Sequence, residues 1–236
     1  MSLRSGGVSR GPFATLNLGL SVGDDPVAVT VNRERFAASF GVGQGRVMRL
    51  DQVHGTAVRV AGIDPIGAEG DAVISDDPAW LLVVSAADCL PVLLHDPVTG
   101  AVAAVHAGWR GAAAGVVPAT VAALADVFGS VPSDLRVWFG AAIRGPRYQV
   151  GPEVAAAFER AGAPPAALWP DPDEPGRYRA DVAALVRAQL ARLGVAREQL
   201  HDSGVCTSAD RRCYSHRRDQ GLTGRHWAAI RVGSEP

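Results

Sequence analysis

The sequence contains no lysine, because all 23 of its basic residues are arginine. A Schiff base with a carbonyl substrate or with pyridoxal phosphate needs a lysine, and so does the phosphate-binding P-loop. Arginine cannot replace lysine as a general base, since a guanidinium group does not lose its proton in proteins. These enzyme classes are excluded, and any nucleophile must come from cysteine, serine, histidine, a carboxylate or a metal.

Cysteines and long apolar runs are also scarce. The three cysteines, Cys89, Cys206 and Cys213, are an odd number in a long chain, which is unlike a secreted disulfide framework and predicts a reducing compartment. The most apolar stretch, residues 79–94, is interrupted by an aspartate and a proline and is shorter than the roughly 20 residues that cross a membrane. The first residues lack the apolar run of a signal peptide. We therefore predict a cytoplasmic protein that does not bind membranes.

A strong net charge is missing as well. The formal charge is -1, so no field attracts nucleic acid or acidic lipid. Apolar residues make up 47% and charged residues 20% of the chain, which is typical of a globular protein. The length of 236 residues suits one large domain, and we expect a single domain over residues 1–236.

The order of elements favours the α+β class. Amphipathic or alanine-rich patterns predict helices at residues 27–40, 109–128, 153–160 and 181–193. Proline at position 118 marks a kink in the second of these or the start of another helix. Short β-type runs predict strands at residues 46–51, 57–60, 71–75, 81–86, 91–95, 101–106 and 135–139. Within two of these strands, residues 81–84 and 101–105 are apolar on both faces, which predicts buried sheets covered on both sides. The proline-rich residues 164–175 are expected to form a surface loop.

Three chemically capable side chains follow or end predicted strands: His54, Cys89 and His106. Two imidazoles and one thiolate would form a zinc site with one open coordination position, as catalytic zinc sites do. The alternative is that Cys89 is a small buried apolar residue and that the histidines are hydrogen-bonded core groups. A copper cluster is less favoured, because it needs closely paired histidines and no two of the six lie within a few residues of each other.

Ordered motifs along nearly the whole chain add a resemblance. They are Arg4-Ser5-Gly6-Gly7-Val8-Ser9, Leu16-Asn17-Leu18-Gly19, Val22-Gly23-Asp24-Asp25, Gln52-Val53-His54-Gly55, Ala87-Asp88-Cys89-Leu90-Pro91, His106-Ala107-Gly108-Trp109-Arg110-Gly111 and Ser215-His216-Arg217-Arg218-Asp219. With them the sequence resembles the YfiH-like proteins, once labelled multicopper polyphenol oxidases or laccases and since described as purine nucleoside phosphorylases with adenosine deaminase activity.

This resemblance implies a mixed α/β sandwich, with buried sheets flanked by helices, in a monomeric cytoplasmic enzyme. It implies zinc, rather than copper, held by His54, Cys89 and His106. The implied reactions are phosphorolysis of adenosine, inosine, guanosine and methylthioadenosine to the base and ribose 1-phosphate, and deamination of adenosine to inosine. Purine nucleosides and inorganic phosphate are then the partners. A role in peptidoglycan editing is also implied in some bacteria.

Other polar residues near these motifs are candidates for substrate contacts. Guanidinium forks bind phosphate well, and the resemblance points most clearly to Arg4. Further candidates for phosphate are Arg110, Arg217, Arg218 and His216, although arginines paired with nearby aspartates on the surface are an equal alternative. Asp88 could orient a ligand or relay a proton, and a turn cap is the other interpretation. Trp109 and Tyr148 are candidates for stacking on a purine, with the core as their alternative place.

Two other functions remain open at the level of sequence. Cys89 activated by His106 would make a cysteine hydrolase or amidase, acting for instance on peptidoglycan precursors. A non-catalytic module that binds nucleosides or a metal is the third hypothesis.

Overall fold

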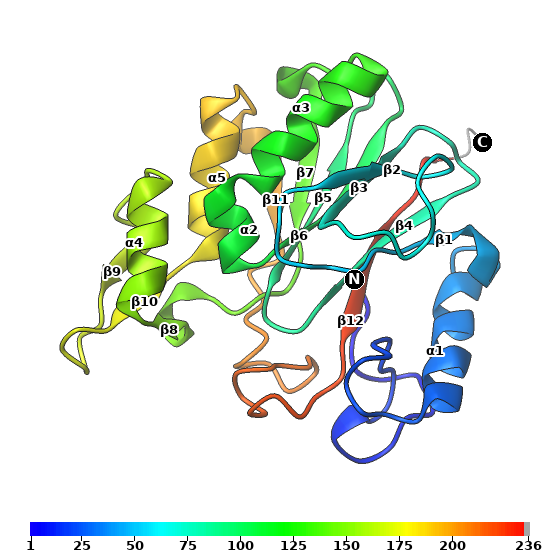
Figure 1. The fold of residues 1–236 in the computed structure, drawn as a ribbon, viewed down its shortest axis with the longest axis horizontal. Helices are drawn as coiled ribbons and strands as arrows, with labels where there is room; N and C mark the ends of the chain where they lie inside the picture. Colours follow the sequence, from blue (N-terminus) through cyan, green and yellow to red (C-terminus); the bar gives the residue numbers. More distant parts are fainter. Residues whose placement is uncertain (234–236) are drawn as a thin grey trace.

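The structure, a computed structural model, describes residues 1–233 and consists of helices packed on β-sheets (Figure 1). The α-helices are α1 (Pro26–Ala38), α2 (Trp109–Ala114), α3 (Val116–Phe128), α4 (Pro152–Arg160) and α5 (Val182–Arg192). Short 3-10 helices are η1 (Gly11–Phe13), η2 (Gln44–Arg46), η3 (Pro132–Asp134), η4 (Gly145–Arg147) and η5 (Arg197–Gln199).

The strands form three sheets. The largest has six strands in the order β11 (Leu200–Asp202), β7 (Arg136–Phe139), β5 (Leu90–His95), β6 (Val102–Ala107), β3 (Ala72–Ser75) and β2 (Val58–Val60). The second has the order β1 (Val47–Met48), β4 (Leu81–Ala86) and β12 (His226–Ile230). The third is small and has the order β8 (Gln149–Val150), β10 (Tyr178–Ala180) and β9 (Leu168–Pro170).

Three apolar clusters join these elements into layers. The largest lies between the six-stranded sheet and the helices α2 to α5. A second lies between the six-stranded sheet and the β1-β4-β12 sheet, and a third lies between that sheet and α1. Figure 1 shows α1 at one side of the molecule and the other helices at the opposite side. The predicted α+β class and mixed sandwich are confirmed.

The alternation of side chains along β6 decides what faces the space between the two sheets. Ala103 and Val105 belong to the cluster under the helices, whereas Val102 and Ala104 belong to the cluster between the sheets. Because side chains alternate along a strand, His106 shares the face of Val102 and Ala104. His106 is therefore placed at the end of the space between the two sheets.

Helix boundaries follow local chemistry. Asp25 caps α1 by accepting a hydrogen bond from the Val27 amide, and Asp181 caps α5 by accepting one from Ala184. The predicted helix over residues 109–128 breaks into α2 and α3 at Gly115, whose φ of 91° is in the left-handed region. Proline 118 is then tolerated, because it lies in the first turn of the second helix.

The sequence analysis missed or misplaced several strands. Of the strand predicted at residues 46–51, only β1 forms, and the segment after it becomes a loop. The proline-rich residues 164–175, predicted to be a loop, contain β9, which is an edge strand that ends in a proline. Strands β8, β10, β11 and β12 were not predicted; the first three have two or three residues, too few for a period-2 pattern.

Within residues 1–233, none of the helices combines the length and the apolar character needed to cross a membrane.

The central core makes a first prediction. Leu94 on β5 is fully buried in the cluster under the helices. Leu94→Ala should lower the free energy of unfolding by about 2 to 5 kcal/mol, because it removes buried apolar contacts and leaves a cavity. Urea unfolding followed by circular dichroism measures this change. The same substitution at Leu222, which is 58% exposed, is the matched control and should change stability by less than about 0.5 kcal/mol. Equal stability of the two variants would contradict this packing.

Candidate active site

Strand pairing brings Asp71 and His106 together. Ala72 on β3 pairs with Val105 on β6, and the His106 amide donates a hydrogen bond of 2.7 Å to the Asp71 carbonyl. The side chains meet as well, since His106 Nδ1 lies 2.8 Å from Asp71 Oδ1. This contact leaves the Nε2 atom of His106 free for another partner.

The same carboxylate holds the turn that carries His54. The Asp71 oxygens accept hydrogen bonds from the backbone amides of His54 at 3.0 Å and of Gly55 at 2.7 Å. His54 has a φ of 62°, a left-handed conformation that costs energy outside glycine and that the two amide contacts help to maintain. Burial raises the pKa of Asp71, but the His106 ring and the two amides outweigh burial and lower the pKa below its usual range.

Cys89 completes the group from the short connection between β4 and β5. The next residue, Leu90, pairs with Ala107 at the end of β6, so Cys89 lies beside the end of the strand that carries His106. One ligand atom from each of His54, Cys89 and His106 lies within 4.8 Å of the others. The structure thus brings the three predicted ligands together.

Two glycines after His106 make room for this approach. A Cβ atom on Gly108 would lie 2.8 Å from Cδ2 of His54 and 3.2 Å from Sγ of Cys89. A Cβ atom on Gly111 would lie 2.8 Å from the Gly55 carbonyl oxygen. Any larger residue at these positions would push the turn of His54 away, which explains the glycine spacing of the motif.

The electrostatics of the group favour a thiolate at Cys89. Burial raises the pKa of the Cys89 thiol, but the charge of His106 and hydrogen bonds from both histidines outweigh it and lower the pKa to about 6. Burial lowers the pKa of His106, whereas Cys89 and the Asp71 carboxylate raise it to about 9. A thiolate and two imidazoles suit zinc, and three ligands leave a position open for water or substrate. The residues present therefore fit a zinc ion.

Asp88, the residue before Cys89, does not orient His106, which is one role that the sequence suggested for it. Its φ is 92°, and its carboxylate accepts hydrogen bonds from the Thr207 hydroxyl and from the Arg217 amide. Its carbonyl accepts one from the Ile143 amide. The carboxylate that orients His106 is Asp71, so that part of the prediction for Asp88 is wrong. Asp88 instead anchors the segment between β11 and β12 beside Cys89.

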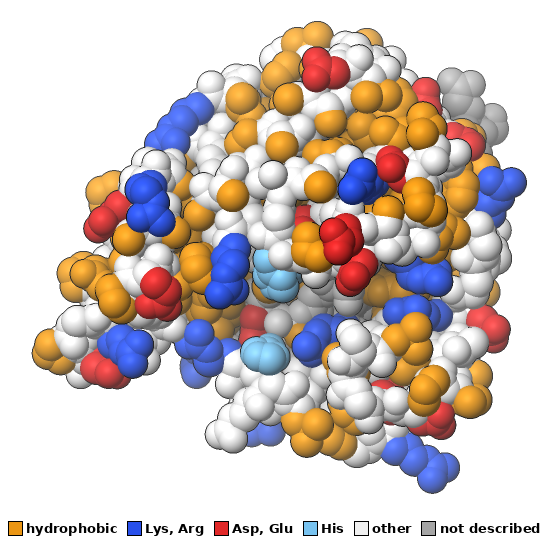
Figure 2. All heavy atoms as spheres, viewed as in Figure 1, with side chains coloured by type: hydrophobic (Ala, Val, Ile, Leu, Met, Phe, Trp, Pro, Cys, Tyr) orange, Lys and Arg blue, Asp and Glu red, His pale blue; other side chains and the backbone are white. Residues whose placement is uncertain are grey.

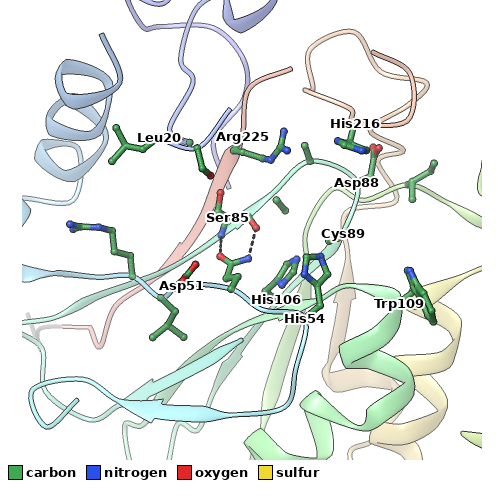
Figure 3. Close-up of a pocket in the computed structure, with 18 of the residues that line it drawn as sticks. Leu20, Asp51, His54, Ser85, Asp88, Cys89, His106, Trp109, His216 and Arg225 are labelled. Carbon is green, nitrogen blue, oxygen red and sulfur yellow. Dashed lines mark hydrogen bonds between the residues drawn. The ribbon is translucent and has the colours of Figure 1, made fainter. Parts of the chain in front are cut away.

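A pocket of about 720 Å³ opens at the three ligands. This volume is in the range of small-molecule sites. Figure 2 shows a hollow in which histidine side chains are visible, with basic side chains around it. Figure 3 shows Trp109 on one side of His54 and His106, and Leu20 and Asp51 on the other. The residues that line it include Leu20, Arg33, Arg49, Asp51, Gln52, His54, Ser85, Asp88, Cys89, His106, Trp109, Tyr148, His216, Arg217 and Arg225.

The predicted phosphate-binding residues divide into two groups. Arg217 and His216 line the pocket, and the Arg217 guanidinium lies 5.1 Å from the centroid of the Tyr148 ring. The pocket lining does not include Arg4, Arg110 or Arg218.

The guanidinium groups of Arg4, Arg110 and Arg218 contact neighbouring residues. Arg4 donates to the carbonyls of Ala14 and Pro12, and Arg110 lies over the ring of Trp109 at 4.4 Å. Arg218 pairs with Asp219 at 2.8 Å and donates to three backbone carbonyls. Their roles in phosphate binding stay predictions.

Sequence reasoning missed several residues of the site. Asp71 precedes an apolar strand, where an aspartate is indistinguishable from an ordinary turn residue. Gln52 exchanges two hydrogen bonds with the backbone of Ser85 and so ties the His54 loop to β4. Three arginines of the lining were also missed: Arg33, Arg49 and Arg225. Of these residues, only Gln52 could have been found from the sequence, because it belongs to the motif that contains His54.

Comparison with known proteins shows which family this chain resembles. Residues 1–233 match the family model described as multi-copper polyphenol oxidoreductase laccase. A protein of Streptomyces coelicolor named a purine nucleoside phosphorylase is 46% identical over 233 residues, which cover 94% of this chain and 90% of that protein. The purine nucleoside phosphorylase YfiH of Escherichia coli is 40% identical over 227 residues, which cover 95% of this chain and 89% of that protein.

Among solved structures, YlmD from Geobacillus stearothermophilus superposes with a TM-score of 0.91 at 34% sequence identity, covering 99% of this chain and 90% of that chain. Fold and sequence therefore define the same class of mixed α/β proteins. The chain belongs to the multi-copper polyphenol oxidoreductase laccase family, in which the YfiH proteins are found. The resemblance drawn from the motifs is confirmed.

The contacts of Asp71 make a second prediction. Asp71→Asn replaces an acceptor-only carboxylate with an amide that cannot accept from all three donors. Zinc affinity should fall by about 10- to 100-fold, as expected when the partner of a ligating histidine is lost. Competition with a chromophoric chelator measures the dissociation constant. Asp64→Asn, at a surface pair with Arg59, is the control and should keep the wild-type affinity. An unchanged zinc affinity in folded Asp71→Asn protein would refute the positioning role.

Proposed function

We propose that the protein is a zinc-dependent purine nucleoside phosphorylase that also deaminates adenosine. The observation that carries the proposal is the grouping of His54, Cys89 and His106 at the pocket of a chain whose relatives are named purine nucleoside phosphorylases. Substrates would be adenosine, inosine, guanosine and methylthioadenosine. We expect the enzyme to act as a monomer in the cytoplasm.

The residues of the site suit these reactions. Zinc, when bound, would supply a Lewis acid able to activate water and to stabilise developing negative charge. Asp71 holds the Nδ1 atom of His106, so that Nε2, which is directed away from the carboxylate, is free to ligate. Trp109 and Tyr148 line the pocket and offer rings against which a purine can stack. The pocket arginines provide donors for phosphate, which phosphorolysis must bring to C1′ of the ribose.

Zinc is proposed in preference to copper despite the family description. Within residues 1–233, the grouping of His54, Cys89 and His106 is the one set in which three such donor atoms come this close. A cluster of several copper ions needs more histidines than this set supplies. A single zinc ion, which is intermediate between hard and soft metals, suits a donor set of one thiolate and two imidazoles.

The third prediction tests the activity itself. Protein of known zinc content is incubated with adenosine in the presence and absence of inorganic phosphate, and the products are separated by chromatography. We expect inosine in both conditions, and adenine, hypoxanthine and ribose 1-phosphate only with phosphate. His106→Ala should abolish all products, because two remaining ligands hold zinc poorly. Absence of inosine and free base from zinc-loaded wild-type protein would reject the proposal.

A cysteine hydrolase is the second candidate, and one observation favours it. His106 is hydrogen-bonded to Asp71, and one of its ring nitrogens lies within 4.8 Å of the Cys89 sulfur, which resembles the nucleophile, base and orienting-carboxylate arrangement of cysteine hydrolases. This function needs a free thiolate, whereas zinc would mask the sulfur. The state of Cys89 therefore separates the two functions. Tight binding of nucleosides without turnover would instead support a non-catalytic module.

The fourth prediction follows from the pKa of Cys89. In chelator-treated protein, alkylation of Cys89 by iodoacetamide should rise with pH with a midpoint of about 6, because the reactive thiolate forms above that pKa. In zinc-loaded protein the same thiol should react slowly at pH 7. Peptide mass spectrometry distinguishes Cys89 from Cys206 and Cys213. Fast alkylation of Cys89 in both preparations would favour the hydrolase.

A further inference from the structure

Three arginines that line the pocket are half-buried and lack a carboxylate partner. Arg33, Arg49 and Arg225 have no carboxylate oxygen within 4.0 Å among residues 1–233. Other half-buried arginines are neutralised by carboxylates or have two of their guanidinium nitrogens bound to backbone carbonyls. The first kind are Arg59, Arg144, Arg179, Arg187 and Arg218, and the second kind are Arg4 and Arg231.

The fold brings these arginines together from three elements. Arg33 lies on α1, Arg49 directly follows β1, and Arg225 directly precedes β12. Arg33 Nε donates to the Leu18 carbonyl at 2.8 Å, and the Leu18 amide donates to the Arg225 carbonyl at 3.1 Å. One residue thus fixes both arginines. Figure 3 shows Arg225 extending from β12 toward Asp88 and His216.

Many of their donors remain free in the described part of the chain. The Arg49 side chain makes no hydrogen bond there, and Arg33 uses only Nε. Arg225 uses only Nη1, which donates to the carbonyls of Thr223 and Gly224. The Arg33 guanidinium also lies 4.9 Å from the Trp227 ring, which fixes its plane while leaving its two terminal nitrogens available.

This arrangement is electrostatically unfavourable without an anion. Burial, followed by the charge of Arg49, lowers the pKa of Arg33 to about 10. Burial also lowers the pKa of Arg225. Two carboxylates line the same pocket, Asp51 and Asp88, but Asp51 is exposed and the oxygens of Asp88 already accept two hydrogen bonds. Neither lies within ion-pair distance of the three guanidinium groups, so their charge is left for a ligand.

We propose that Arg33, Arg49 and Arg225 form a subsite that binds a phosphate dianion inside the pocket. Guanidinium forks match the oxygens of phosphate, and partial burial strengthens each charge-assisted hydrogen bond. The dianion is either inorganic phosphate or the 5′-phosphate of a nucleotide, since both present the same oxygens. Its use in phosphorolysis rests on the proposed function, whereas its affinity for phosphate does not.

The subsite differs from the arginines chosen from the sequence. Arg4, Arg110 and Arg218 do not line the pocket, and Arg217 is exposed beside Tyr148. An anion held by Arg225 would share a pocket with the candidate metal ligands, because Arg225, Cys89 and His106 line the same cavity. A phosphate there could reach a nucleoside bound over the zinc site.

The fifth prediction tests this subsite by phosphate binding and not by turnover alone. Zinc-loaded wild type, Arg49→Gln and Arg225→Gln are titrated with inorganic phosphate by calorimetry. Each substitution should weaken phosphate binding by about 10- to 100-fold, the effect of losing a charge-assisted contact. Arg49 is the cleaner variant, since its side chain holds no other group in residues 1–233. Arg177→Gln, at an exposed pair with Glu174, is the matched control and should bind like wild type. Melting temperatures verify folding.

Two further titrations decide whether the dianion is inorganic phosphate or the 5′-phosphate of a nucleotide. If inorganic phosphate binds together with adenosine, the subsite holds the co-substrate. If adenosine 5′-monophosphate competes with phosphate, binds more tightly than adenosine, and loses that advantage in Arg49→Gln, the subsite holds a nucleotide phosphate. Either result supports the subsite.

Two results would overturn it. One is wild-type phosphate affinity in both pocket variants, combined with a loss in Arg217→Gln. The other is failure of the wild-type protein to bind millimolar phosphate or nucleotide. Failure of the proposed function looks different: phosphate binds and depends on Arg49, but no base is released. Conversely, base release with an unchanged KM for phosphate in both variants would retain the function and reject the subsite.

Discussion

The buried carboxylate of Asp71 is the constraint on which the candidate active site depends. It is fully buried and accepts hydrogen bonds from the His106 ring, the His54 amide and the Gly55 amide. A buried carboxylate without partners is costly, so the three donors must stay in place as long as the fold is intact. One side chain therefore sets the orientation of one ligand and the backbone position of another. Pairing of β3 with β6 fixes Asp71 itself, which makes ligand geometry a consequence of strand register.

The third ligand depends on how the two sheets are connected. Strand β4 belongs to the three-stranded sheet and β5 to the six-stranded sheet, and only residues 87–89 join them. Such a short connection forces Cys89 to the edge where the sheets meet, which is where the inter-sheet face of β6 presents His106. Asp88 adopts a positive φ within this connection and holds the segment that carries Arg217. The pocket is thus bounded by segments that are far apart in the sequence.

Much of this arrangement could be predicted from the sequence, and the limits have physical causes. The strands at 81–86 and 101–106 could be predicted because residues 81–84 and 101–105 are continuously apolar. Cys89 follows the first strand, and His106 ends the second. Asp71 could not be selected, since its role arises from register with β6, which no local pattern encodes. Strand β12 was missed although its residues are mostly buried, because Ala228 and Ala229 carry weak strand preference. The sheet formed by β8, β9 and β10 is built from pieces too short for any periodic signal.

The arginines show a related limit and also a reason for the missing lysine. Arg33 lies in a helix beside Asn32 and Glu34 and resembles any solvent-facing cation, so sequence alone cannot tell that it faces a pocket. Two arginines that line the pocket lie over aromatic rings, Arg33 over Trp227 and Arg217 over Tyr148. A planar guanidinium can be stacked and partly buried and still keep its proton, whereas a buried lysine readily becomes neutral. Even with its pKa lowered to about 10, Arg33 remains charged at neutral pH. A pocket that must stay positive while excluding water is therefore better lined with arginine than with lysine.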